Sequence, residues 1–283
     1  MIAGMLITIR EGLEAFLITG ILLGYLRKVG RPAFNRYVWA GTVVGVLASV
    51  GLALIFQRLA VQFEGSRAAL FEAIASGIAV PILSYMVLYM QRQSHKFKAE
   101  AEVKAELAIS TGQVLALGTL AFITVLREGL ETALFLTALT TRVSGGGLML
   151  GAILGLVLAS AIAYTIFAST IRLNLRRFFI VTGFLLIFIA AGLCAHIFMA
   201  LHEVGFHALG MTAWSTKAIL DNESFLGRLL HAFMGYHDEP TVMQVIAYFG
   251  YLGIMGWAFL RAVKASARPK ASEAGLQKQP AVR

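Results

Sequence analysis

One charged pentapeptide occurs twice in stretches of sequence that are otherwise apolar. The sequence Arg-Glu-Gly-Leu-Glu occupies residues 10–14 and again residues 127–131, and apolar residues flank both copies. A charged side chain at the centre of a bilayer costs roughly 2.5–3.5 kcal/mol, so intramembrane charges mark function. In each copy two glutamates outnumber one arginine. This excess of negative charge calls for a bound cation or for protons on the carboxylates.

The composition indicates a membrane protein. Of the 283 residues, 58% are hydrophobic and only 14% are charged, whereas a soluble protein has about 25% charged residues. Seven apolar runs reach the roughly 20 residues that a membrane-spanning helix needs. They lie near residues 1–26, 37–57, 68–90, 112–141, 148–171, 178–201 and 241–260. Their length predicts an all-α polytopic protein with seven transmembrane helices and not a barrel.

The basic residues predict how the chain is oriented. Seventeen Lys and Arg residues follow the first, third, fifth and seventh runs, whereas only five lie in the other connections. Because positive loops stay in the cytoplasm, the N-terminus is expected outside and the C-terminus in the cytoplasm. Positive loops facing anionic lipid also account for the net charge of +9, so no nucleic-acid partner is needed. The lone cysteine, Cys194, excludes a disulfide within the chain.

The repeated motif predicts an inverted repeat. Its two copies fall in the first and fourth runs, so they are offset by three runs and the second copy crosses the membrane in the opposite direction. We therefore expect a single permease domain over 1–260, followed by a basic, disordered tail over 261–283. Within the domain, repeat one covers 1–110 and repeat two covers 111–201. An outer loop then covers 202–240, and the seventh span covers 241–260.

Glutamates three residues apart lie on one face of a helix. Glu11 and Glu14 therefore point the same way, as do Glu128 and Glu131, and pairing the two spans would gather four carboxylates. Oxygen ligands of this kind suit hard cations. The small Gly12 of the first motif, like its counterpart in the second, lets another helix approach closely.

The motifs also fit two other interpretations, structural ion pairs and a proton relay. Arg10 can pair with Glu14, and Arg127 with Glu131, purely to hold the bundle together. That arrangement leaves one glutamate of each motif without compensation, which favours a metal site. A proton relay also uses buried glutamates, but it does not require four acids in paired arrays.

Glu72 is a candidate ligand near the outer end of the third span, although it equally fits an interfacial residue. His196, in the sixth span, is interpreted as a satisfied interior histidine. The outer loop contains further acids and histidines, and these fit a metal-gathering vestibule and an ordinary solvated loop equally well. The pathway candidates there are Asp221, Glu223, His231, His237, Asp238 and Glu239. Apolar residues at helical spacing over 225–233 predict an amphipathic helix beside them.

The paired motif resembles that of the iron/lead permease family, the oxidase-dependent iron transporters. Glu72 and the stretch from Asp221 to Gly227 also match. The resemblance implies seven spans and high-affinity uptake of iron, generally ferric, across a bacterial inner membrane. It implies that Glu11, Glu14, Glu128 and Glu131 are translocation ligands, with Arg10 and Arg127 as their charge partners. It further implies a periplasmic iron-oxidising or iron-binding protein as partner.

We therefore expect a multi-pass transporter and not an enzyme, with the iron ion as substrate and no cofactor. Two alternatives remain open at this point. Carboxylates alone discriminate poorly among divalent metals, so lead or another divalent ion is the first alternative. An intramembrane di-metal oxidase is the second, although such sites combine glutamate with Glu-x-x-His and both motifs here are Glu-x-x-Glu.

Overall fold

A computed structural model of the chain describes nine stretches of residues. These are 1–62, 65–93, 97–110, 114–140, 145–168, 175–204, 211–217, 219–222 and 224–267. Within them the chain is helical, apart from short connections and an isolated bridge between Thr212 and Thr241. The helices are α1 (Ile2–Lys28), η1 (Pro32–Phe34), α2 (Asn35–Gln62), α3 (Ser66–Gln93), α4 (Phe97–Ser110), α5 (Val114–Thr140), α6 (Gly145–Ala168), α7 (Leu175–Glu203), α8 (Phe225–Met234) and α9 (Val242–Ala267).

Each of the seven apolar runs lies on one long helix, and together they form an all-helical membrane protein. Among the described residues, five segments are long and apolar enough to cross a bilayer. They are Pro32–Arg58, Ser66–Gln91, Gly146–Phe167, Arg176–His202 and Val242–Ser266. The other two long helices, α1 and α5, have 27 residues each and carry the charged motifs.

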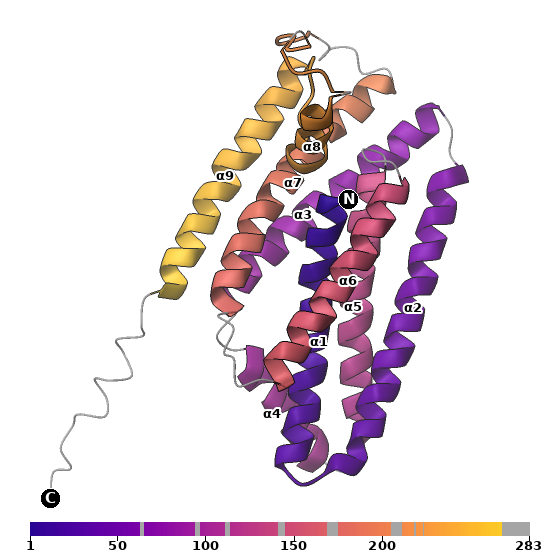
Figure 1. Ribbon diagram of the computed structural model, residues 1–283, viewed down its shortest axis with the longest axis vertical. Helices are drawn as coiled ribbons and strands as arrows, with labels where there is room; N and C mark the ends of the chain where they lie inside the picture. Colours follow the sequence, from indigo (N-terminus) through magenta and orange to yellow (C-terminus); the bar gives the residue numbers. More distant parts are fainter. Residues whose placement is uncertain are drawn as a thin grey trace, which may run out of the picture.

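Two short helices lie at opposite ends of the bundle, α8 at one end and α4 at the other (Figure 1). The charged connector over 91–110, where Lys and Glu alternate around alanines, predicts a short surface helix. Helix α4 lies within it and buries Ala105 and Ala108 against α1 and α5. The expected amphipathic helix is α8. Ser224 caps its N-terminus by accepting a hydrogen bond from the Gly227 amide, and Gly235 ends it with a positive φ of 70°.

The basic tail begins later than expected. Helix α9 continues through Arg261 and Lys264 to Ala267, so residues 261–267 are helical and not disordered as the sequence predicted. The guanidinium of Arg261 lies 3.7 Å from the centre of the Trp257 ring, a cation–π contact that supports this last turn. The remainder of the predicted tail, 268–283, lies outside the described residues.

The long helices pack as three principal pairs, α1 with α6, α2 with α5 and α3 with α7, and α9 packs on α7 (Figure 1). Helices α1 and α5 also contact each other across the middle of the bundle. This pattern of pairs is symmetric if α1, α2 and α3 correspond to α5, α6 and α7. Under that correspondence the α1–α6 pair is equivalent to the α5–α2 pair, and the α3–α7 and α1–α5 pairs are each equivalent to themselves.

Small residues bring α1 and α6 together. Gly151 of α6 lies directly against the backbone of Met1, and Gly155 lies against the backbone of Met5 and the side chain of Thr8. A Cβ atom added at either glycine would collide with these atoms. The close approach replaces side-chain contacts with backbone contacts, as in other membrane helix pairs that use small residues at four-residue spacing.

The α2–α5 pair is built in the same way. Gly41 lies against the backbone of Gly118, and Gly45 lies against the Phe122 carbonyl and the Val125 side chain. The contact positions in the two pairs correspond at constant offsets in residue number. Residues of α2 precede their α6 counterparts by 110, as Gly41 does Gly151, and residues of α5 follow their α1 counterparts by 117, as Gly118 does Met1. The two halves therefore share one helix-packing register.

Candidate functional site

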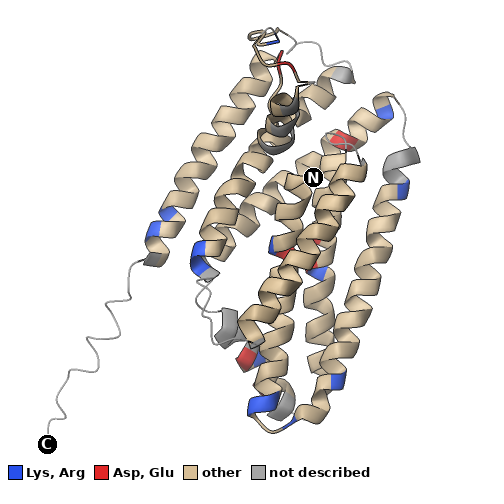
Figure 2. Ribbon diagram, viewed as in Figure 1, with Lys and Arg blue, Asp and Glu red and all other residues tan. Residues whose placement is uncertain are grey.

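Both charged motifs lie midway along their helices, while most of the other charged residues drawn in Figure 2 lie near helix ends. Carboxylate oxygens of Glu11, Glu128 and Glu131, one from each residue, all lie within 4.8 Å of one another. We call these three residues the carboxylate cluster. Since α1 contributes one member and α5 contributes two, the cluster exists only because the two helices pack together.

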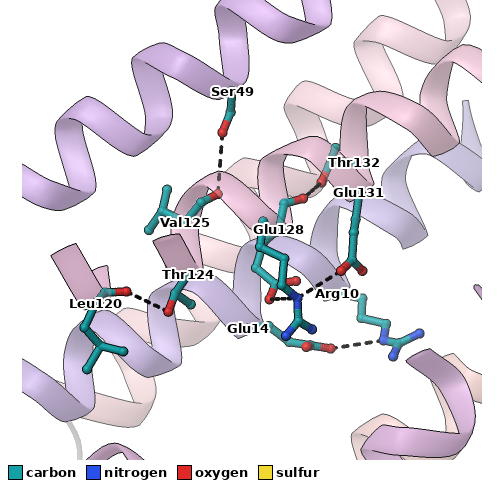
Figure 3. A network of polar contacts seen from close by, with 10 residues as sticks. Arg10, Glu14, Ser49, Leu120, Thr124, Val125, Glu128, Glu131 and Thr132 are labelled. Atoms are coloured by element: carbon teal, nitrogen blue, oxygen red, sulfur yellow. Dashed lines mark hydrogen bonds and ion pairs between the residues drawn. The ribbon is translucent and has the colours of Figure 1, made fainter. Parts of the chain in front are cut away.

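Each arginine pairs with the glutamate four residues later in its own motif (Figure 3). The Arg10 Nε atom lies 3.2 Å from Glu14 Oε1, and the Arg127 Nε atom lies 3.0 Å from Glu131 Oε1. Arg127 also reaches a second acid, with its Nε atom 3.5 Å from Glu128 Oε1. The structure therefore places Glu14, the fourth predicted ligand, in an ion pair with Arg10 next to the cluster.

The site is buried, and five of its carboxylate oxygens have no hydrogen-bond partner. Glu11, Glu14 and Glu128 are all at most 3% exposed. Both carboxylate oxygens of Glu11 are buried without a hydrogen-bond partner, as is one oxygen each of Glu14, Glu128 and Glu131. Buried polar atoms are almost always hydrogen-bonded, so orphaned carboxylate oxygens that converge on one point indicate a place for a cation.

The motif glycines let two further helices pack closely against the motifs. A Cβ atom at Gly12 would lie 3.0 Å from the Cβ of Ala159 on α6, and one at Gly129 would collide with the side chain of Ser49 on α2. The helices that approach the glycines are thus α6 and α2. Each motif therefore presents its glutamates to the other motif and its glycine to the second helix of the other repeat.

Apolar layers close the site toward both ends of the bundle. On the α8 side, Ile7 precedes Glu11 by one turn and Phe135 follows Glu131 by one turn, and both are fully buried in one apolar cluster. On the α4 side, Leu22 of α1 and Leu117 of α5 are fully buried in another cluster. Fully buried apolar side chains therefore lie on both sides of the carboxylates along α1 and α5.

A second polar pair lies nearer the α8 end of the bundle. Glu72 Oε2 of α3 is 3.3 Å from His196 Nε2 of α7, and the glutamate side chain keeps 24% of its surface exposed. His196 also lines a cavity of about 210 Å³, whose wall includes Trp214, His237 and Tyr248. The sequence interpretation of His196 as satisfied in the interior did not anticipate that it joins Glu72 to an outer cavity.

Most pathway candidates of the outer segment hold that segment together. The Asn222 amide donates to Asp238 Oδ1 at 2.8 Å, and the Ser215 hydroxyl donates to Glu239 Oε1 at 3.0 Å. The rings of His231 and His237 meet edge to face with centroids 4.9 Å apart.

His237 also lines the cavity, and the Asp221 carbonyl accepts a hydrogen bond from the hydroxyl of Ser224, the residue that caps α8. Glu223 lies outside the described residues. Among the described candidates of this segment, His237 lines the cavity, and the carboxylate cluster includes none of them.

Comparison with known proteins identifies the family. The profile of the Iron permease FTR1 family matches residues 1–267. The chain belongs to this family. The "Ferrous iron permease EfeU" of Yersinia pestis is 36% identical over 250 residues, which cover 87% of this chain and 89% of the relative. The protein of the same name from Escherichia coli O6:K15:H31 is 35% identical over 250 residues, covering 87% of this chain and 91% of the relative. No solved structure matches the chain.

Family membership establishes the broad function. A member of an iron permease family whose chain has five or more membrane-crossing helices is a membrane transporter and not an enzyme. The expected resemblance to iron permeases is confirmed over nearly the whole chain.

The sequence interpretation missed one structural feature of the site. The repeat extends beyond the pentapeptide into the ladder of small residues, Gly41, Gly45 and Ser49 on α2 and Gly151, Gly155 and Ala159 on α6. The signal was present as the spacing small-x-x-x-small-x-x-x-small in both second spans. Residue identity between the two spans is weak evidence for a repeat, because only the glycines are identical and glycines are common in membrane helices.

Proposed function

We propose that the chain carries iron inward across a bacterial inner membrane and binds it at the carboxylate cluster of Glu11, Glu128 and Glu131. The observation that carries the proposal is the convergence of these three carboxylates within 4.8 Å, deep between α1 and α5. Their orphaned oxygens supply hard ligands, and hard cations such as iron ions are bound by carboxylates.

Glu14 completes the site as a fourth acid. It is as buried as Glu11, and one of its oxygens has no hydrogen-bond partner. Four carboxylates and two guanidinium groups leave an excess of negative charge that a cation offsets. Arg10 and Arg127 act as the charge partners that limit the repulsion among the acids when iron is absent.

All seven long helices then span the bilayer. Helices α1 and α5 are as long as the five apolar segments and lie among them, and three of their four motif glutamates are buried in the bundle. The charge asymmetry of the loops places the α8 end outside and the α4 end in the cytoplasm. The shared packing register of α1–α6 and α5–α2 supports an inverted repeat of α1–α3 and α5–α7, with α9 added.

An inverted repeat suggests how the ion passes. The cluster lies between the two halves and is closed by apolar layers on both sides. We infer that this is an occluded arrangement, and that rocking one repeat against the other opens the Ile7–Phe135 side or the Leu22–Leu117 side in turn. Iron first passes the outer cavity and the Glu72–His196 pair, where His237 is the other potential ligand.

A separate periplasmic iron-oxidising or iron-binding protein is the proposed donor at the outer face. The sequence resemblance favours ferric iron, whereas the curated relatives are named for ferrous iron. The two oxidation states are therefore separate arms of the test. Lead and other divalent ions form a third arm, since oxygen ligands alone discriminate weakly among them.

The test is uptake of radiolabelled iron into proteoliposomes that contain the purified protein. Wild type is compared with Glu11→Gln and Glu128→Gln, which keep the shape of the side chain and remove its charge. Glu106→Gln is the matched control, because Glu106 is an exposed glutamate on α4 outside the cluster. Ferrous iron under reducing conditions, ferric citrate and lead are supplied separately.

We expect wild type and Glu106→Gln to accumulate iron, and both cluster variants to lose uptake while keeping the wild-type melting temperature. Uptake by the cluster variants at the wild-type rate would show that these acids are scaffold. Accumulation of lead and not of either iron species would reassign the cargo. Consumption of ferrous iron without accumulation would favour the oxidase alternative.

A further inference from the structure

The two motif arginines hold different acids, although they occupy equivalent positions. Arg10 pairs with Glu14, which lies outside the carboxylate cluster. Arg127 pairs with Glu128 and Glu131, which are two of the three members of that cluster. A cation that binds the cluster therefore competes with Arg127 for two of the same carboxylates, those of Glu128 and Glu131, and leaves the Arg10–Glu14 pair in place.

The surroundings of the two arginines differ as well. The Arg10 side chain is 1% exposed, whereas the Arg127 side chain is 51% exposed. Arg127 lies on the open face of α5, next to the exposed side chains of Ile123 and Leu130, and its own motif partner Glu131 is only partly buried. Arg10 is enclosed within the bundle, with its Nη1 and Nη2 atoms buried, and the adjacent Leu13 is fully buried too.

We propose that Arg127 is a tethered cation that occupies the metal site when iron is absent, is displaced when iron binds, and returns to help release it. Arg10 has no such part and is a fixed counter-charge for Glu14. This inference rests on the proposed function, since it assumes that the cluster binds the transported ion. It adds Arg127 as a residue that controls the affinity for iron and the rate of iron release, although Arg127 pairs with the ligands and is not itself a ligand.

Competition of this kind lowers the apparent affinity for iron and speeds release. If the guanidinium occupies the cluster for nine-tenths of the time, iron binds about tenfold more weakly than to a vacant cluster. Removing the guanidinium should therefore tighten binding and slow turnover together. A fixed counter-charge behaves differently, because it is present in both the bound and the free state.

The first experiment measures binding of ferrous iron to the purified protein by anaerobic titration calorimetry, with uptake rates measured in parallel. Arg127→Gln is expected to bind iron about tenfold more tightly than wild type and to take it up more slowly at saturating iron. Arg127→Lys should lie between them, since an ammonium group competes for one oxygen at a time. Arg10→Gln is the matched control, in which a positive charge is lost without loss of a competitor.

Simple Coulomb attraction predicts that both Gln variants tighten binding alike, and that result would overturn the proposal. Unchanged or weaker binding by Arg127→Gln would overturn it too. If Glu128→Gln binds iron as wild type does, the proposed function itself has failed. If Glu128→Gln loses binding and Arg127→Gln does not gain it, only the role of Arg127 has failed.

The second experiment needs no variant, so it stands even if Arg10→Gln does not fold. Phenylglyoxal modifies accessible guanidinium groups, and mass spectrometry locates the modified arginines. With saturating ferrous iron we expect Arg127 to react several-fold faster than in iron-free protein, while Arg10 stays unmodified in both. Equal reaction of Arg127 with and without iron would mean that its guanidinium is not displaced.

Discussion

The two copies of the motif have identical sequences and different environments. In α1 the arginine and both glutamates are buried, and the arginine holds the glutamate outside the cluster. In α5 the arginine is half exposed and reaches into the cluster. A repeated sequence therefore does not imply repeated roles, because each side chain acts through what the rest of the fold packs against it.

The parts that remain symmetrical are those that set helix distance. The small residues of α2 and α6 contact α5 and α1 at equivalent positions, and the motif glycines face these second helices in both halves. The asymmetry enters with the elements that have no counterpart. Helices α8 and α9 follow repeat two, and α8 contacts α1 and α7.

The largest expected difference between the two halves concerns stability. Arg10→Gln leaves Glu14 as an uncompensated buried charge, and breaking a buried ion pair costs about 3–5 kcal/mol. Arg127→Gln breaks a pair whose arginine is half exposed, so it should cost about 1 kcal/mol or less. Thermal melting of the iron-free variants in detergent measures both. Equal losses would mean that the two arginines have the same structural role.

The second comparison concerns iron affinity. Glu131→Gln removes a member of the cluster and should weaken binding by at least the roughly 10–100-fold that loss of an outer-shell partner costs at metal sites. Glu14→Gln removes an acid that Arg10 already engages, so its effect on the dissociation constant should be smaller. Titration calorimetry with ferrous iron ranks the two. A larger effect at Glu14 would place the ion on the α1 side of the site and break the asymmetry.

The third comparison concerns the motif glycines and has the smallest expected effect. A methyl group at Gly129 collides with Ser49, and overpacking of this kind costs about 1–3 kcal/mol. The same change at Gly12 meets Ala159 at 3.0 Å and Leu156 at 3.4 Å, which are milder contacts, and should cost less. The melting temperature should fall further for Gly129→Ala than for Gly12→Ala.

A second-site change tests that cause. Ser49→Gly removes the colliding atoms, so it should restore the melting temperature of Gly129→Ala without restoring that of Gly12→Ala. Gly51→Ala is the control on α2, where an added Cβ meets nothing within 4 Å. Failure of Ser49→Gly to rescue would mean that the register of α2 and α5 differs from that described.

Much of the fold could be predicted because hydrophobic length is a local property of the chain. The seven apolar runs, the short helix over 97–110 and the amphipathic helix over 225–234 all correspond to helices of the structure. The end of α9 could not be placed, because basic residues suit a helix C-terminus and a solvated tail equally well. The family was also predictable, since the duplicated motif is a rare pattern.

The candidate site was predictable in its residue types and only partly in its geometry. Glutamates three residues apart share a helix face by backbone geometry alone, so their convergence could be expected. Which three of the four glutamates form the cluster depends on how α1 and α5 cross and on which glutamates each arginine pairs with. The pairing of Glu72 with His196 depends on α3 and α7 packing together, although 124 residues separate the two side chains in sequence.

The sequence by itself determined that this protein crosses a membrane and keeps acids within it, because hydrophobicity and charge are properties of each residue. It also determined the repeated small residues that let helices approach. Only the tertiary structure decided that α6 packs on α1 and α2 on α5, and that Glu14 pairs with Arg10 beside the cluster. It also decided that the Arg127 side chain is half exposed whereas the Arg10 side chain is buried. These are decided by burial and by distances between segments far apart in the chain, and two identical pentapeptides acquire different properties only through their neighbours.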